Sequence, residues 1–153
     1  MLKGGLFPLR CKMRLRLLGI FSGSHLHMKA SDCVEAIGRL DTKLNAVVHK
    51  EPNACSEPAS DSGRDGSIQD MCVLVKDSID VKGMPTVVGD KERVGAIADN
   101  DAPLVKRMRD AGAIILGKTN VPAGCLDLQT FNEVFGTTNN PYDLSRTPGG
   151  STG

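Results

Sequence analysis

The sequence contains few aromatic residues: no Trp, one Tyr and four Phe, or 3% of its 153 residues. Proteins that hold single-stranded nucleic acid by stacking rely on such rings, so the composition argues against direct nucleic-acid binding. The formal net charge is only +1 at pH 7, which gives no indication of a polyanionic partner. The longest apolar stretches are far shorter than the ~20 residues that cross a membrane, so we expect no membrane span.

Paired cysteine and histidine motifs are also missing. The sequence has an odd number of cysteines, and none forms a C-x-x-C pair; they are Cys11, Cys33, Cys55, Cys72 and Cys125. This usage is typical of reduced, intracellular proteins rather than of disulfide frameworks. His25 and His27 have no partner at ligand spacing. We therefore predict no metal and no cofactor, and an intracellular location.

Acidic residues are absent from the first 31 residues, which carry six bases: Lys3, Arg10, Lys12, Arg14, Arg16 and Lys29. A basic, Leu-rich, acid-free start is typical of a mitochondrial transit peptide. The alternative is a disordered or wrongly assigned N-terminus. We predict that residues 1–30 form a basic arm, a candidate targeting segment, so that the location is either cytoplasmic or mitochondrial.

The hydrophobic pattern of residues 31–153 predicts an α/β protein. Residues 31–48 have a helical apolar face, and residues 51–70 are rich in Pro, Ser, Gly and acids, as in an exposed loop. Two short apolar runs, at 71–75 and 113–116, fit buried strands. Between them, residues 101–111 predict a helix with Asp101 as N-cap, a buried stripe and a terminating glycine. We expect that stripe to contain Leu104, Val105, Met108 and Ala111.

Residues 112–119 read GAIILGKT and match the phosphate-loop pattern G-x-x-x-x-G-K-[ST]. In a true phosphate loop a strand precedes the first glycine, and the four variable residues form a loop that wraps the phosphates. Here a predicted helix precedes Gly112, and the variable residues form a β-prone run. We therefore reject nucleotide binding.

Two positions remain that could carry chemistry. Lys76 directly follows an apolar strand, where burial would favour its neutral form and let it act as a general base. Ser151 lies in the glycine-rich segment Arg146–Gly153, whose backbone could present a hydroxyl and aim N–H groups at an anion. Taken singly, each position also has a simpler interpretation. Lys76 could be a strand-end lysine that reaches water, and the segment around Ser151 could be an ordinary polar loop.

Together with their surroundings, these residues resemble the amidase signature family. The matching segments run in order from residue 71 to the end: VKD at 75–77, GMPT at 83–86, DA at 101–102, AGAIILGKTN at 111–120, FGTTNNP at 135–141 and RTPGGS at 146–151. The resemblance implies a mixed β-sheet covered by helices on both faces. It also implies hydrolysis of a small-molecule amide through a Ser–Ser–Lys triad. In that triad Lys76 is the base, and Ser151 is the bridging serine, held through a cis peptide bond.

The match has limits. The family's nucleophilic serine lies in a second glycine-rich segment beyond residue 153, and Thr152 replaces the second serine of the usual motif. We therefore expect a partial amidase domain over residues 31–153 that is inactive and folds poorly alone. Two alternatives stay open. One is the glutamine-hydrolysing subunit of the amidotransferase in transfer-RNA-dependent amidation, which would act with partner proteins. The other is a non-catalytic remnant that binds a partner.

Overall fold

The computed structural model describes residues 29–56 and 68–153. The basic arm therefore lies almost entirely outside the described residues, as does most of the exposed loop predicted at 51–70. The bounds of the basic arm and of the exposed loop therefore remain predictions. None of the helices in the described ranges is long and apolar enough to cross a membrane.

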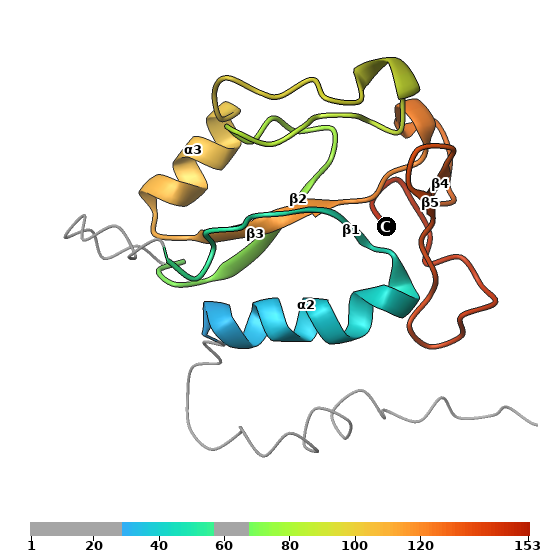
Figure 1. Cartoon of the computed structure of the whole chain (residues 1–153), viewed down its shortest axis with the longest axis horizontal. Helices are drawn as coiled ribbons and strands as arrows, with labels where there is room; N and C mark the ends of the chain where they lie inside the picture. Colours follow the sequence, from blue (N-terminus) through green and yellow to red (C-terminus); the bar gives the residue numbers. More distant parts are fainter. Residues whose placement is uncertain (1–28, 57–67) are drawn as a thin grey trace, which may run out of the picture.

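A three-stranded mixed sheet forms the centre of the fold, in the order β1-β3-β2. β1 (Val47–Lys50) runs antiparallel to β3 (Ile114–Thr119), and β2 (Cys72–Lys76) runs parallel to it. Parallel pairing aligns Lys76 with Thr119, so the carboxyl ends of β2 and β3 lie side by side at one end of the sheet. The short hairpin β4 (Phe131–Asn132) and β5 (Gly136–Thr137) lies beyond that edge (Figure 1).

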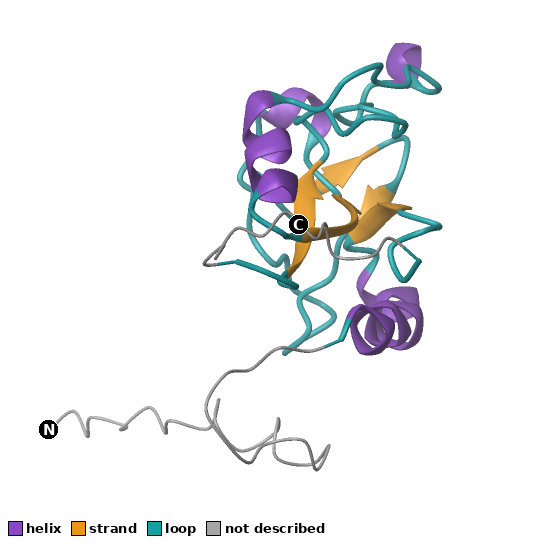
Figure 2. Cartoon of the chain, turned by 90° about the vertical axis from the view of Figure 1, so that its left-hand side faces the viewer, coloured by secondary structure: helices purple, strands orange, loops and turns teal. Residues whose placement is uncertain are grey.

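Helices cover both faces of the sheet, as the α/β prediction requires. α2 (Ala30–Leu44) lies on one face and α3 (Pro103–Asp110) on the other, and the two views at right angles agree (Figures 1 and 2). Two short 3₁₀ turns, η2 (Lys91–Arg93) and η3 (Ala123–Cys125), punctuate the connections. The predicted mixed sheet between helices is confirmed.

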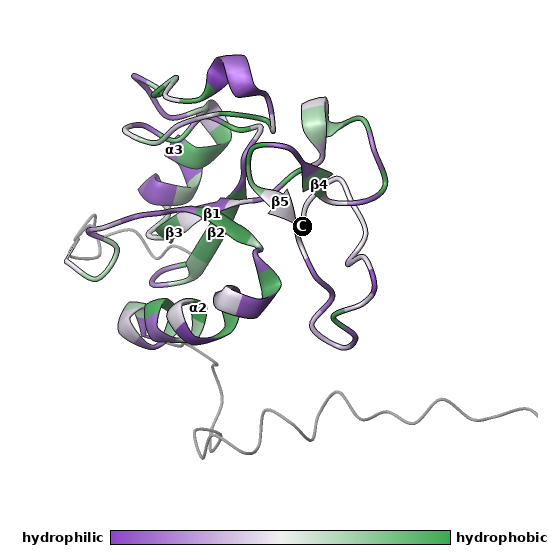
Figure 3. Ribbon diagram, turned by 45° about the vertical axis from the view of Figure 1, so that its right-hand side comes forward, coloured by the Kyte–Doolittle hydropathy of each residue, from purple (hydrophilic) through white to green (hydrophobic). Residues whose placement is uncertain are grey.

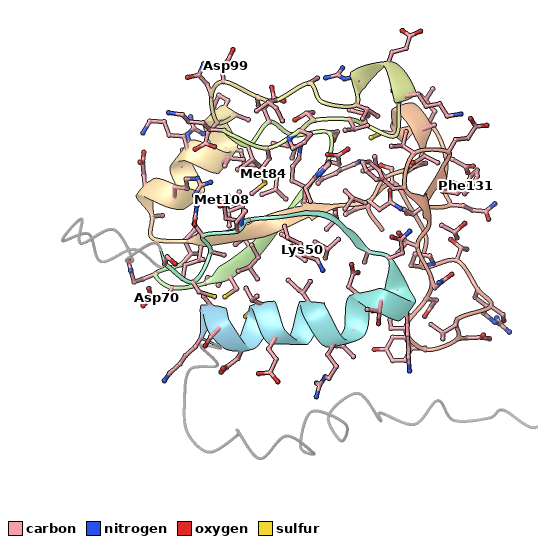
Figure 4. All side chains as sticks on the ribbon, in the orientation of Figure 1. Lys50, Asp70, Met84, Asp99, Met108 and Phe131 are labelled. Carbon is pink, nitrogen blue, oxygen red and sulfur yellow. The ribbon has the colours of Figure 1, made fainter. Side chains whose placement is uncertain are left out.

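The core lies between α3 and the sheet. Its buried members are Val75, Val81, Met84, Val105 and Ile115. Met84 and Met108 lie between the helix and the strands in Figure 4, and Figure 3 shows hydrophobic colouring along β2. The predicted buried stripe is only partly right, because the Leu104 side chain is 54% exposed. Leu104 lies in the first turn of α3, on a different side of the helix from the buried Val105.

The predicted N-cap of the second helix is wrong. Ala102 occupies that position without a side-chain cap, and Pro103 is the first helical residue. The Asp101 carboxylate instead accepts a hydrogen bond from the Lys82 backbone N–H at 2.8 Å and pairs with Arg109 at 3.2 Å. Gly112 follows the helix with a positive φ of 91°, as a terminating glycine should.

The segment that resembled a phosphate loop is a buried strand. Gly117, Lys118 and Thr119 all lie within β3 and pair with β1 or β2. A Cβ atom at Gly117 would fall 2.1 Å from the carbonyl oxygen of His49, so only glycine lets β1 approach this closely. The rejection of nucleotide binding here therefore agrees with the geometry.

Candidate active site

Lys76 and Ser151 are in direct contact. Lys76 is the last residue of β2, and its Nζ donates a hydrogen bond of 2.5 Å to the Oγ of Ser151. Both side chains are half-buried, so the lysine is less enclosed than its position after an apolar strand suggests. The peptide bond between Gly150 and Ser151 is cis. A base and a hydroxyl thus stand within proton-transfer distance.

The loop that carries Ser151 is anchored on both sides of the serine. Thr130 donates its hydroxyl hydrogen to the carbonyl oxygen of Gly149 at 2.8 Å, and the N–H of Gly153 donates to the carbonyl oxygen of Asn120 at 2.9 Å. Gly150 is packed against backbone, since a Cβ there would lie 2.8 Å from the carbonyl carbon of Leu128. These contacts fix the position of the Ser151 hydroxyl.

Beneath this loop lies a network of buried amides and hydroxyls. Asn120 donates from its Nδ2 to the hydroxyl of Thr138 at 3.1 Å, and Asn132 donates to the Oδ1 of Asn120 at 2.8 Å. Thr138 in turn donates to the carbonyl oxygen of Asn45, at the end of α2, at 2.7 Å. All three side chains of the network are 1% exposed or less. The network therefore joins α2, the end of β3 and the hairpin into one support.

On the neighbouring strand, a second lysine is fully buried. The Lys118 Nζ donates to the carbonyl oxygen of Pro85 at 2.6 Å and to the hydroxyl of Thr86 at 2.7 Å. It also lies 3.1 Å from the Oδ1 of Asp77, and neither charged side chain of this pair is exposed. Burial lowers the pKa of Lys118, while Asp77 acts in the opposite direction.

Asp77 connects three segments at the edge where β2 and β3 end. Its Oδ2 accepts a hydrogen bond from the N–H of Val88 at 2.7 Å, and its Oδ1 lies 3.7 Å from the Nε2 of His49 on β1. That nitrogen is buried and has no hydrogen-bond partner within the described ranges. Burial, as the main cause, lowers the pKa of His49, and Asp77 opposes the shift. The charge of Asp77 is therefore met chiefly by Lys118.

Lys118, Asp77 and Asn120 were not predicted as site residues. Lys118 and Asn120 stand in the segment that matched the phosphate-loop pattern or directly after it, and Asp77 follows Lys76. A charged residue inside a buried strand was the available signal. Because charged side chains are almost never fully buried without a partner, such a lysine indicates a specific ion pair.

Two cavities formed by the described residues include neither Lys76 nor Ser151. One, of about 980 Å³, is lined by residues of β1, the turn at 82–85 and α3, and it contains neither Lys76 nor Ser151. A smaller one, of about 340 Å³, borders the Ser151 loop and includes Thr130 and Thr147. The base and the hydroxyl that are in contact, Lys76 and Ser151, therefore lie outside the lining of both cavities. No group of three or more candidate metal ligands occurs within residues 29–56 and 68–153.

Comparison with known proteins identifies the family. The profile of the amidase family, described as Amidase, matches residues 30–153. The chain belongs to the amidase family, as the resemblance in the sequence predicted.

Individual relatives agree with this membership. The chain is 35% identical, over 131 residues, to a glutamyl-tRNA(Gln) amidotransferase subunit from Salinispora tropica. It is similar to the structure of the same subunit from Thermotoga maritima (28% identity, TM-score 0.68) and to the peptide amidase of Stenotrophomonas maltophilia (31%, 0.69). These matches cover 78%, 82% and 82% of this chain but only 26%, 30% and 29% of the relatives. The chain therefore spans between a quarter and a third of their length.

Proposed function

We propose that this chain supplies the lysine and the bridging serine of an amide-hydrolysing site. The observation that carries the proposal is the 2.5 Å contact between Lys76 Nζ and Ser151 Oγ. Serine is a weak nucleophile until a neighbouring base removes its proton, and a neutral lysine amine can be that base. The family resemblance adds a second serine beyond residue 153 as the nucleophile.

The proposed sequence of proton transfers follows from this arrangement. The neutral Lys76 amine accepts the proton of the Ser151 hydroxyl, and Ser151 accepts the proton of the nucleophilic serine. The nucleophile attacks the amide carbonyl and forms an acyl-enzyme, and the proton held at Lys76 returns to the leaving amine. Water then releases the acid. No cofactor takes part in any of these steps.

A chimaera tests the proposal directly. Residues 30–153 would replace the matching part of the Stenotrophomonas maltophilia peptide amidase, and ammonia release from a peptide amide would be measured. We expect Lys76→Ala and Ser151→Ala to lower kcat/KM by at least ~10³-fold, because members of a catalytic unit are each indispensable. Two exposed residues, Lys106 and Ser145, give matched controls; their alanine variants should change kcat/KM less than about threefold. Full activity of Ser151→Ala would sink the proposal.

A second candidate function is that of a glutamine amidotransferase subunit. It is favoured by the Salinispora tropica relative, which is named as a glutamyl-tRNA(Gln) amidotransferase subunit. Such a protein would release ammonia from glutamine and work with protein partners. Glutamate formation from glutamine, measured with and without candidate partner proteins, separates this function from that of a broad amidase.

The third candidate is a non-catalytic remnant that binds a partner. The intact mass of the endogenous protein, with peptide sequencing past Gly153, separates it from both enzymes. A second glycine-rich serine segment favours an enzyme, whereas a mass near 16.3 kDa favours the remnant. We further propose an intracellular location from the cysteine usage; a mitochondrial one rests on the basic arm alone.

A further inference from the structure

Asp77, which directly follows the base Lys76, has each of its polar groups held by the fold. Its N–H donates to the carbonyl oxygen of Thr119 at 3.1 Å, and its carbonyl oxygen accepts from the Lys118 Nζ at 3.3 Å. In the carboxylate, Oδ2 accepts from the Val88 N–H at 2.7 Å, and Oδ1 is met by the charge of Lys118 at 3.1 Å rather than by a hydrogen bond. The side chain is fully buried. The strand that ends in Lys76 is therefore fixed at its next residue.

Val88, which the Asp77 carboxylate holds, has a strained backbone. Its φ is 57°, in the left-handed region, which is an outlier for a β-branched residue. Such a conformation persists only where the surrounding structure imposes it. Two hydrogen bonds do so here: the Val88 N–H donates to Asp77, and the Val88 carbonyl oxygen accepts from the Gly124 N–H at 2.9 Å. Loss of the Asp77 carboxylate would therefore release one side of this turn.

The strained turn packs against the support of the serine loop. A Cβ atom at Gly89 would lie 2.8 Å from the Cβ of Asn132, so only glycine allows this close approach. Asn132 donates to the Oδ1 of Asn120 at 2.8 Å. The carbonyl oxygen of Asn120 in turn accepts from the N–H of Gly153, two positions after Ser151, at 2.9 Å. Contacts therefore connect the lysine strand with the serine loop.

We propose that Asp77 is a positioning residue for amide hydrolysis, which holds the Lys76 amine and the Ser151 hydroxyl at proton-transfer distance. This inference rests on the proposed function, since it concerns the same base and hydroxyl. Asp77 acts through its neighbours: its backbone is fixed directly after Lys76, and its carboxylate holds the turn at Val88 that packs against the support of the serine loop. Lys118 supplies the charge that allows this carboxylate to be buried.

Positioning matters here because proton transfer depends steeply on distance. A displacement of about 1 Å from the productive geometry can cost on the order of 10²-fold in rate. The Lys76 amine and the Ser151 hydroxyl lie 2.5 Å apart, although their segments are separated by 75 positions in the sequence. The Asp77 carboxylate connects these segments, and its burial strengthens its hydrogen bond to Val88.

The first test measures kcat and KM for a peptide amide in the chimaera that carries residues 30–153. Asp77→Ala is combined with Lys118→Met, so that neither partner of the ion pair is left buried alone. We expect kcat to fall ~10–100-fold while KM changes less than about threefold. Adding Val88→Gly should recover kcat at least about threefold, because glycine adopts a positive φ without strain. A role of the ion pair in stability alone would not give this recovery.

Two further variants separate positioning from stability. Val105→Ala, in the buried core beneath α3, should lower stability but change kcat less than about twofold while the chimaera stays folded. Gly89→Ala leaves the ion pair intact but forces its new Cβ against Asn132, so it should lower kcat ~10-fold or more. Gly89→Ala therefore tests the same connection even where the Asp77 variant fails to fold. An unchanged kcat in Gly89→Ala would overturn the proposal.

A second measurement uses the full chain and needs no hydrolysis. Trace labelling with acetic anhydride, followed by tryptic mapping, compares the reactivity of the Lys76 amine with that of the exposed Lys106. Trypsin releases DGSIQDMCVLVK when Lys76 is unlabelled and a longer peptide, ending at Lys82, when it is acetylated. With Asp77→Ala and Lys118→Met, Lys76 should react at least ~3-fold faster relative to Lys106, because it loses its hydrogen bond to serine.

The Ser151→Ala chain gives the reactivity of Lys76 when that contact is fully lost. Equal reactivity of Lys76 in the unmutated chain and in the Asp77 variant would overturn the positioning role. The outcomes also separate the two proposals. If Lys76→Ala and Ser151→Ala leave the chimaera active, the proposed function fails, and the labelling still tests the positioning. If both abolish activity while the Asp77 variant keeps its kcat, the positioning role alone fails.

Discussion

Lys76 and Ser151 lie 75 positions apart in the sequence, yet their side chains meet at 2.5 Å. Two parts of the fold hold these two side chains in place. The pairing of β2 with β3 fixes the lysine, and the buried amide network around Asn120 fixes the loop of the serine. The contact is therefore a product of the whole described fold rather than of either loop alone.

The first prediction concerns the buried ion pair beside this contact. Lys118→Met should lower the free energy of unfolding by about 3 kcal/mol, because it leaves the Asp77 carboxylate buried without its cation. The measurement is urea unfolding of the full chain. Lys106→Met is the matched control, since Lys106 is exposed and its pairing with Asp110 contributes little. Equal stability of the two variants would show that the pair is unimportant.

A second prediction follows from His49 and concerns pH. Burial lowers the pKa of His49 below its ordinary 6.5, so the folded chain keeps the ring neutral while the unfolded chain protonates it. The unfolded state then binds more protons as the pH falls through 6.5 towards the lower folded pKa. This contribution to stability is fully present above pH 6.5 and is lost on acidification.

Comparison of the unmutated chain with His49→Gln isolates this effect from other titrations. Unfolding free energies measured at several pH values between about 5 and 8 should fall more steeply with acid in the unmutated chain. If the two curves run parallel, the ring is not held neutral by the fold.

The third prediction uses two glycines in opposite surroundings. Gly150→Ala should displace the Ser151 loop, because the new Cβ would lie 2.8 Å from the backbone of Leu128. Gly38→Ala should stabilise α2 by about 0.5–1 kcal/mol, since nothing lies within 4 Å of the added carbon and alanine favours helices. Thermal unfolding of both variants is the measurement: the melting temperature should fall for Gly150→Ala and rise for Gly38→Ala. A stabilising Gly150→Ala would contradict the close approach.

Part of this arrangement could be predicted from the sequence. The apolar runs before Lys76 and after Gly112 predicted two strands, and the helix between them predicted an α/β unit; that the two strands pair in parallel was found in the structure. The amidase resemblance linked Lys76 with Ser151, and it is the membership that the family profile confirmed. These features depend on local patterns and on an ordered series of motifs.

The rest depends on contacts between distant segments. Asp101 looked like an N-cap because the helix follows it, but its carboxylate is used by Lys82 and Arg109. Lys118 looked like part of a spurious motif, and its carbonyl, hydroxyl and carboxylate partners lie at least 32 positions away. No spacing rule connects such residues, so only the fold could reveal the buried pair.

The central claim is that Lys76 and Ser151 act as one unit in amide hydrolysis. The most direct measurement is a double-mutant cycle in the peptide amidase chimaera, with kcat/KM for Lys76→Ala, Ser151→Ala and the combination. Residues that pass one proton between them lose their function together, so the double variant should be no slower than the worse single variant. Losses that multiply, or a single variant that keeps full activity, would contradict the claim.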